Sequence, residues 1–289
     1  WHIGAHYTDR FAIIHAGAGF AETAKYNRIK LENYPPPVEQ QLWGNYDVPA
    51  YARNLLNTKV VAYSGEVDKQ KQAADLMATV LATHGHELDH IIGPGMGHKY
   101  DGNSRKQVHA RVNKALAKGR NPFPKKIHLQ TRTLRYNRIH WLEVTGLQQH
   151  WKDSRVDADF RAPGQVELVT RNLNAIRIHP PLEEMHAFPK GFQVKVDGQV
   201  LHVGKPPPTI SLVRTANSWN LGIPADKLLR KKHGLQGPID DAFMAPFIVV
   251  TPSGTHANPA IEKWVHFELA HFLARWRALY RAEPRVIED

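Results

Sequence analysis

The chain contains no cysteine and no apolar run of 18 residues, and both absences narrow what it can be. Without cysteine there are no disulfides and no thiolate metal ligands, although the compartment stays open. Without a long apolar run, no segment is suited to span a membrane as a helix. The 289 residues, 42% hydrophobic and 22% charged, therefore predict an ordinary globular protein that is large enough for two domains.

The chain has fewer acidic residues, 27, than lysines and arginines, 38, and its formal net charge is +11. Such an excess of positive charge suggests nucleic acid as one class of partner to consider. The densest basic cluster, Lys227–His233, is short, and acidic residues stand near it at Asp226, Asp240 and Asp241. This pattern is typical of a solvated helix end, and no nucleic-acid-binding motif accompanies it. We therefore expect no nucleic-acid partner.

The chain is organised around the stretch Lys59–Tyr100. An apolar run at Val60–Tyr63 predicts a buried strand, and His90–Ile92 predicts a second one. Between them, the apolar residues from Ala73 to Leu81 have the one-sided spacing of a surface helix, which Gly85 ends. The stretch therefore predicts a strand-helix-strand unit with loops after both strands.

Asp68 follows the first of these strands, and His98 lies in the glycine-rich loop after the second. Loops at the carboxyl ends of neighbouring parallel strands lie at one edge of a sheet. A histidine can act there as a general base near pH 7, with a carboxylate holding its tautomer. This order predicts the acid and histidine of a Ser-Asp-His triad. The alternatives are that Asp68 only caps the following helix and that His98, one of 18 histidines, is only solvated.

The same residues carry a family resemblance. AYSGEVDKQKQAADLM and IIGPGMGHKY resemble the C-terminal half of the catalytic domain in the prolyl oligopeptidase family of serine hydrolases, especially its large bacterial members. Trp1–Phe11 resembles the helix after the nucleophile elbow, and Leu134–Val144 and Leu235–Val250 resemble later segments of those proteins. The resemblance covers essentially the whole chain. It implies an α/β-hydrolase fold, catalytic Asp68 and His98, and a peptide or ester substrate.

The chain departs from that family in one respect: the nucleophile motif G-x-S-x-G is absent. Ser64 and Ser253 have no glycine two residues before them, so neither forms the elbow. The family's serine would precede Trp1, and the oxyanion donors would be missing too. We therefore expect the chain to be an inactive part of a serine hydrolase whose nucleophile lies upstream.

Three parts are expected along the chain, at residues 1–119, 127–203 and 209–289. The fold class is α/β: the first part is the C-terminal half of an α/β-hydrolase sheet, the second a β-rich, sandwich-like domain, and the third a partial α/β segment with a long helix at Asn258–Tyr280. The linkers are the proline- and glycine-containing stretches Gly119–Lys126 and Gly204–Pro208.

Smaller elements are expected within these parts. Helices are predicted at Trp1–Arg10, Pro49–Leu56 and Gly102–Ala117, and strands at Phe11–His15 and Phe247–Val250. In the β-rich part, alternation over Ile127–Thr133 and the Asp197-Gly198 pair predict a strand and a tight hairpin. Several such strands without helices between them favour an antiparallel sheet or sandwich.

Two sites of other kinds are also conceivable. His84–His90 contains three histidines and two carboxylates, a composition that can bind zinc or copper. It crosses a helix-to-strand turn, where the side chains diverge, so a surface role is preferred. Ala16–Gly19 lacks the complete glycine pattern of a phosphate cradle, and it is expected to be a tight strand exit beside the active site. No metal and no cofactor is expected.

A second class of function also fits the sequence. Hydrolase folds host non-enzymatic functions, so the chain could belong to a binding protein that holds a polymer such as a glycan. The β-rich part and the aromatic residues before Asn57 would then form the binding surface. An acid and a histidine in triad order are not required by a binder, and this favours the hydrolase. Oligomeric state and localisation stay open.

Overall fold

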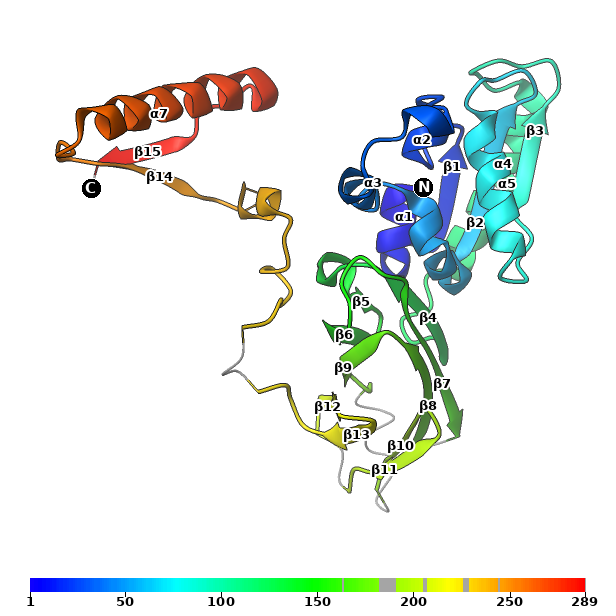
Figure 1. The fold of residues 1–289 in the computed structure, drawn as a ribbon. Helices are drawn as coiled ribbons and strands as arrows, with labels where there is room; N and C mark the ends of the chain where they lie inside the picture. The colour runs from blue at the N-terminus through cyan, green and yellow to red at the C-terminus, as the bar shows by residue number, and fades with distance from the viewer. Residues whose placement is uncertain (163, 182–190, 205–206, 226–228, 244, 289) are drawn as a thin grey trace. The chain divides into compact units, whose positions relative to one another are not determined.

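The computed structural model describes residues 1–162, 164–181, 191–204, 207–225, 229–243 and 245–288. The chain divides into two compact units, residues 1–233 and residues 234–289. Helices and several sheets occur together (Figure 1), which confirms a mixed α/β class with β-rich parts. Parts of the proline-rich stretch Gly204–Pro208 and of the basic cluster Lys227–His233 with Asp226 lie outside the described residues.

The first unit begins with a parallel three-stranded sheet in the order β1-β2-β3 (Figure 1). Its strands are β1 (Ile13–Gly17), β2 (Lys59–Gly65) and β3 (Asp89–Gly93). Helix α4 (Lys71–Ala82) connects β2 to β3, and α5 (Gly102–Lys118) follows β3. All residues of β2 after the first are buried, as expected for a central parallel strand that is covered on both faces.

The two long helices pack on opposite faces of this sheet. Met77 of α4 belongs to one core cluster with Ala62, whereas Val108 of α5 belongs to another with Val61. Successive residues of a strand point to opposite faces, so adjacent residues of β2 enter different clusters. The strand-helix-strand unit expected at Lys59–Tyr100 is confirmed, and so is the helix that follows it.

Short helices precede β1 in the chain and connect β1 to β2; η marks a 3₁₀ helix. They are α1 (His2–His6), η1 (Thr8–Arg10), α2 (Thr23–Tyr26), η2 (Leu31–Asn33), α3 (Pro37–Trp43) and η3 (Val48–Asn57). The helix expected over Trp1–Arg10 is interrupted at Tyr7, whose φ of −132° is not helical. The helix expected at Pro49–Leu56 is present as η3, and its buried Tyr51 and Leu55 join the α4 cluster.

His6, at the end of α1, is enclosed by rings. Its imidazole stacks on Tyr136 with centroids 3.4 Å apart, and the rings of His2 and Tyr51 lie at 4.4 and 4.3 Å. Within the described part of the chain, neither His6 nitrogen has a hydrogen-bond partner. Burial, and then the charges of His2 and Arg135, lower the pKa of His6 to about 2. The imidazole is therefore neutral in the folded protein at neutral pH.

We expect acid to destabilise the first unit through His6. Below a pH of about 6.5 the unfolded chain binds a proton at His6, whereas the folded chain does not. The free energy of unfolding therefore has its full value above that pH and falls by about 1.4 kcal/mol for each pH unit below it. A His6→Phe variant keeps a ring against Tyr136 and removes the titration. In urea unfolding, the loss of stability between pH 7 and pH 5 should be about 2 kcal/mol smaller in the variant than in the unsubstituted chain. Equal losses in the two proteins would contradict this account.

Residues 126–221 contain two five-stranded sheets that share one core. The first sheet has the order β11-β10-β8-β7-β4 and the second β13-β12-β9-β6-β5. The strands are β4 (Lys126–Thr131), β5 (Arg138–Ile139), β6 (Leu142–Leu147), β7 (Ser154–Ala162), β8 (Gln165–Arg171), β9 (Leu173–Ile178), β10 (Gln193–Val196), β11 (Gln199–His202), β12 (Ile210–Thr215) and β13 (Ser218–Leu221). All pairs are antiparallel except β10 with β8. The arrangement is a β-sandwich, as the pattern of short strands favours.

The sequence predicts that the β-rich part ends at Val203, but the sandwich continues beyond this residue. β12 pairs with β9, and β13 pairs with β12, so both belong to the second sheet. Trp219 of β13 is buried in the shared core. The proline-rich Gly204–Pro208 therefore stands between two strands of one sandwich. Proline interrupts strand pairing locally, but it does not prevent the next strand from rejoining the sheet.

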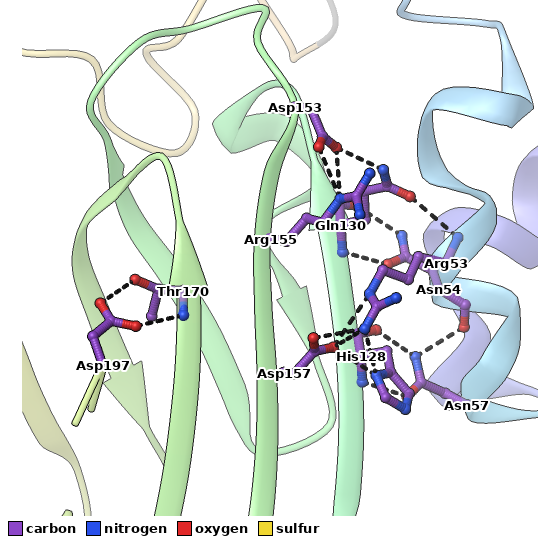
Figure 2. Close-up of polar contacts among 10 residues, drawn as sticks. All are labelled: Arg53, Asn54, Asn57, His128, Gln130, Asp153, Arg155, Asp157, Thr170 and Asp197. Carbon is purple, nitrogen blue, oxygen red and sulfur yellow. Dashed lines mark hydrogen bonds and ion pairs between the residues drawn. The ribbon is translucent and has the colours of Figure 1, made fainter. Parts of the chain in front are cut away.

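The hairpin expected at Asp197-Gly198 is confirmed. Both residues are left-handed, with φ of 47° and 87°, as a two-residue turn of this type requires. The Asp197 carboxylate accepts the Thr170 N–H and hydroxyl at 2.7 and 2.6 Å (Figure 2), and also the Trp219 indole N–H at 2.9 Å. The turn is thus tied to strands of both sheets.

The 3₁₀ helix η3 covers the outer edge of β4 (Figure 2). The Asn57 side chain donates to the His128 carbonyl at 2.7 Å and accepts the His128 N–H at 2.8 Å. Asn54 forms the same pair with Gln130, at 3.0 and 2.6 Å. His128 and Gln130 are two residues apart on β4, so their backbone groups point to the same side of the strand. The two asparagines of η3, one helical turn apart, form the hydrogen bonds that a neighbouring strand would otherwise form at this edge.

A charged cluster reinforces this junction (Figure 2). Arg53 of η3 donates through Nη2 to both oxygens of Asp157 at 2.6 Å, and His128 lies 2.6 Å from the same carboxylate. Burial would raise the pKa of Asp157, but the hydrogen bonds from His128 and Arg53 hold it below its ordinary value. The parts expected at 1–119 and 127–203 therefore belong to one unit.

The second unit is a β-α-β segment, preceded by η5 (Ile239–Phe243). Its elements are β14 (Ile248–Thr251), α7 (Pro259–Tyr280) and β15 (Arg285–Glu288), with the two strands parallel. The expected strand near Phe247 and the expected long helix are both confirmed. The ring of Phe247 lies 4.8 Å from that of Trp276 on α7.

Nowhere in the described ranges is a helix long and apolar enough to cross a bilayer.

Candidate active site

Asp68 and His98 meet at the carboxyl edge of the parallel sheet. Asp68 lies in the turn after β2 and His98 in the loop after β3, and these two strands are parallel neighbours. The His98 Nδ1 atom lies 2.9 Å from Asp68 Oδ2. The sequence predicts that these two residues act together, and the structure brings them into hydrogen-bond contact.

The contact determines which nitrogen of His98 is available for proton transfer. An ionised carboxylate only accepts hydrogen bonds. The Nδ1 atom of His98 therefore carries the ring proton and donates a hydrogen bond to Asp68. Nε2 is then the unprotonated nitrogen that can accept a proton from another group. The His98 side chain is 68% exposed and that of Asp68 only 6% exposed, so the carboxylate is covered while the imidazole faces outward.

Asp68 also organises the turn that leads into α4. Its Oδ1 atom accepts the N–H of Gln70 at 2.8 Å, which leaves Oδ2 for His98. The N-cap of α4 is Gln70, so Asp68 does not cap this helix, contrary to the alternative considered from the sequence. The Gln70 side chain in turn accepts the N–H of Gly19 at 2.9 Å, which links the turn to the loop after β1.

Three hydrogen bonds join the loop of His98 to the turn of Asp68. The N–H of Glu66 donates to the Gly93 carbonyl at 2.9 Å, and the N–H of Val67 donates to the Met96 carbonyl at 3.0 Å. The Glu66 carboxylate accepts the N–H of Gly95 at 2.7 Å. These bonds hold the backbone of the loop, up to two residues before His98, against the turn that carries Asp68.

Gly65 allows the two loops to approach this closely. A Cβ atom at this position would lie far inside van der Waals contact with the carbonyl oxygens of Gly97 and Met96. Both are backbone atoms of the loop that carries His98, so they cannot rotate away as a side chain would. The last residue of β2 is therefore glycine because the neighbouring backbone occupies the space of a side chain.

The loop Ala16–Gly19 uses its amide groups within the protein. Ala18 donates its N–H to the Tyr63 carbonyl at 2.8 Å, and Gly19 donates to Gln70. Both residues are left-handed, with φ of 52° and 89°. Since these two donors are already bonded, they are not open to a phosphate, in agreement with the interpretation of this stretch as a tight strand exit.

A second polar group near this edge was not found from the sequence. His15 Nδ1 lies 3.2 Å from the Val61 carbonyl and so carries the proton, and its Nε2 accepts from the Tyr100 hydroxyl at 2.6 Å. Tyr100 stacks on Tyr63 with ring centroids 4.0 Å apart, and burial raises the pKa of both tyrosines. His15 and Tyr100 are 85 residues apart and no motif links them, so no local signal points to this pair.

Ser64 and His90 form a contact that resembles a nucleophile and its base. The His90 Nε2 atom lies 3.1 Å from Ser64 Oγ, and Asp75 lies 4.0 Å from Nδ1. Ser64 is fully buried, so no substrate reaches its hydroxyl. Burial also lowers the pKa of His90. We interpret the contact as a structural hydrogen bond.

The histidine-rich stretch His84–His90 does not form a metal centre in the structure. Its members point to different partners: His90 contacts Ser64, whereas the charged groups near His84 belong to the junction with β7 and are Arg53, Arg155, Asp153 and Asp157. Among the described residues, no group of three histidine, aspartate or glutamate side chains is placed to hold a metal ion.

Comparisons with protein-family models, with curated proteins and with solved structures found no match to this chain. The assignment of a function therefore rests on the geometry of the site and on the sequence resemblance.

Proposed function

We propose that residues 1–119 are the C-terminal part of an α/β-hydrolase catalytic domain and contribute the acid and the base of a serine hydrolase. Asp68 orients His98, and His98 activates a serine that lies upstream of Trp1. The observation that carries the proposal is the hydrogen bond of 2.9 Å between His98 Nδ1 and Asp68 Oδ2. The resemblance to the prolyl oligopeptidase family supports the same assignment and suggests a peptide or ester substrate.

Each side chain has a defined part in the proposed reaction. His98 Nε2 accepts the serine proton as the serine oxygen attacks the substrate carbonyl, and the Asp68 carboxylate stabilises the resulting imidazolium. The imidazolium then protonates the leaving amine or alcohol, which leaves an acyl-enzyme. In the second half of the reaction His98 takes a proton from a water molecule while the water oxygen attacks the acyl carbonyl. The bond to the serine oxygen then breaks, the imidazolium returns the proton to that oxygen, and the acid leaves.

The surroundings of the pair support this proposal. The chain order of the acid and the histidine is that of α/β-hydrolases, and both follow neighbouring parallel strands. His98 is exposed, so a serine on an adjacent segment has access to its Nε2 atom. Ser64, at the end of β2, and Ser104, in the first turn of α5, are both buried, so neither competes for that role.

Labelling with a fluorophosphonate tests the proposal, because this reagent reacts only with an activated serine. Three proteins are needed: the chain extended upstream to include the proposed elbow, its His98→Ala variant, and the 289-residue chain. We expect strong labelling of the extended chain alone. A folded extended chain that remains unlabelled would refute the proposal and favour the non-catalytic, polymer-binding alternative.

A further inference from the structure

A cavity of about 540 Å³ lies at the amino edge of the parallel sheet, opposite to Asp68 and His98. Its lining includes Ala12, which precedes β1, Lys59, which begins β2, and residues from the end of α5. His140, from the turn between β5 and β6, closes it on the side of the sandwich. β2 has seven residues, so about 20 Å separates this cavity from the His98 loop.

The charges around the cavity have one sign. Lys59, Lys118 and Arg120 line it, and no aspartate or glutamate does. Across the described residues, none of these three cations is in an ion pair with a carboxylate. Arg120 is positioned by a hydrogen bond of 2.8 Å from Nη1 to the backbone carbonyl of Asp9. That bond leaves the other guanidinium donors available for a ligand.

Two groups near the cavity disfavour an anion: the Asp9 carboxylate and the carbonyl end of α5. Both already accept hydrogen bonds within the protein. The Asp9 carboxylate accepts the His140 N–H at 3.1 Å, and Asp9 does not line the cavity. The carbonyl end of α5 disfavours anions, but the N–H of Gly119 already donates to the Ala115 and Leu116 carbonyls at 3.0 Å. Three cationic side chains line the opening and one carboxylate lies beside it, so positive charge predominates there.

The remainder of the lining is partly apolar. Phe11, Leu56 and Pro124 contribute to it, together with the buried Ala115. A cavity of this volume suits a small molecule, and apolar walls with a few charged groups are typical of such sites. The combination selects a ligand with an apolar body and an anionic head.

We propose that this cavity is a binding site for a small amphipathic anion, an aryl or alkyl carboxylate or phosphate. Lys118 and Arg120 bind the anionic head, and the apolar body lies against Phe11, Leu56 and Pro124. The site is separate from the proposed catalytic pair and does not depend on the upstream serine, so it can be tested on the present chain.

The test uses 8-anilinonaphthalene-1-sulfonate, an anionic aromatic dye, with the neutral N-phenyl-1-naphthylamine as its counterpart. In the Lys118→Gln/Arg120→Gln double variant, we expect the anionic dye to bind about tenfold more weakly at this site, whereas the neutral dye is unaffected. Lys114→Gln/Arg105→Gln removes the same charges from exposed positions of α5 that do not line the cavity. It should leave the binding of both dyes unchanged.

Dye that binds elsewhere on the protein is insensitive to the changes at Lys118 and Arg120. Only the part of the dye binding that the Lys118→Gln/Arg120→Gln variant loses therefore reports on the cavity. Equal binding of the anionic dye to both double variants would overturn the proposal. Benzoate and phenyl phosphate then serve as competitors. Displacement of the dye by either supports the site and identifies its head group, whereas displacement by neither contradicts it.

Discussion

If the chain contributes to a serine hydrolase as proposed, replacing His98 with alanine in the upstream-extended chain is expected to lower kcat/KM by about 10⁴-fold or more. Without the imidazole, no group is in place to take the serine proton or to protonate the leaving group. Asp68→Asn should have an effect of similar size, because an amide facing Nδ1 no longer enforces the tautomer in which Nε2 is the base. Hydrolysis of a p-nitrophenyl ester or a peptide p-nitroanilide by the upstream-extended chain measures both effects.

His109 provides the matched control for the His98 variant. It is an exposed histidine on α5 in the same unit, and we expect His109→Ala to retain normal turnover. Circular dichroism of all the variants verifies that they fold. Near-normal turnover in folded His98→Ala would rule out this histidine as the base, whatever the fluorophosphonate result.

Replacing Gly65 with alanine is expected to lower kcat/KM by about 100-fold, although the side chain added is only a methyl group. Its Cβ would collide with the carbonyl oxygens of Gly97 and Met96, so the loop that carries His98 must move. A displacement of about 1 Å at a catalytic group is enough for a loss of this size. The loss should appear mainly in kcat, because the change acts through the position of the proposed general base.

The same loop contains the control for this change. A Cβ atom at Gly97 would meet no atom within 4 Å, so Gly97→Ala adds the same methyl group without a collision. We expect Gly97→Ala to retain activity within a few-fold of the unsubstituted enzyme. Equal activities of the two variants would show that the approach of the loops at Gly65 does not position His98.

Several elements follow directly from sequence patterns. The buried run at Val60–Tyr63, the one-sided helix that becomes α4 and the Asp-Gly hairpin at Asp197 all occur where the patterns place them. The pairing of Asp68 with His98 could also be anticipated, because the order of strands and loops places both at one sheet edge. These features depend on residues near one another in the chain or on a repeated unit.

Other features could not be predicted in this way. The sequence suggests a domain boundary after Val203, whereas β12 and β13 complete the same sandwich. Proline-rich segments are common both between domains and between strands, so the composition does not distinguish these cases. Only the pairing of β12 with β9 decides where the sandwich ends.

The sequence by itself thus determined the local elements and the two side chains of the candidate site, because periodicity, turn chemistry and loop position are properties of short segments. The tertiary structure alone decided how these segments meet. Asn57 contacts His128 across 71 positions and His15 contacts Tyr100 across 85, while the collision at Gly65 involves a separate loop. Such contacts depend on the packing of distant segments, and the residues that form them carry no local signal of their partners.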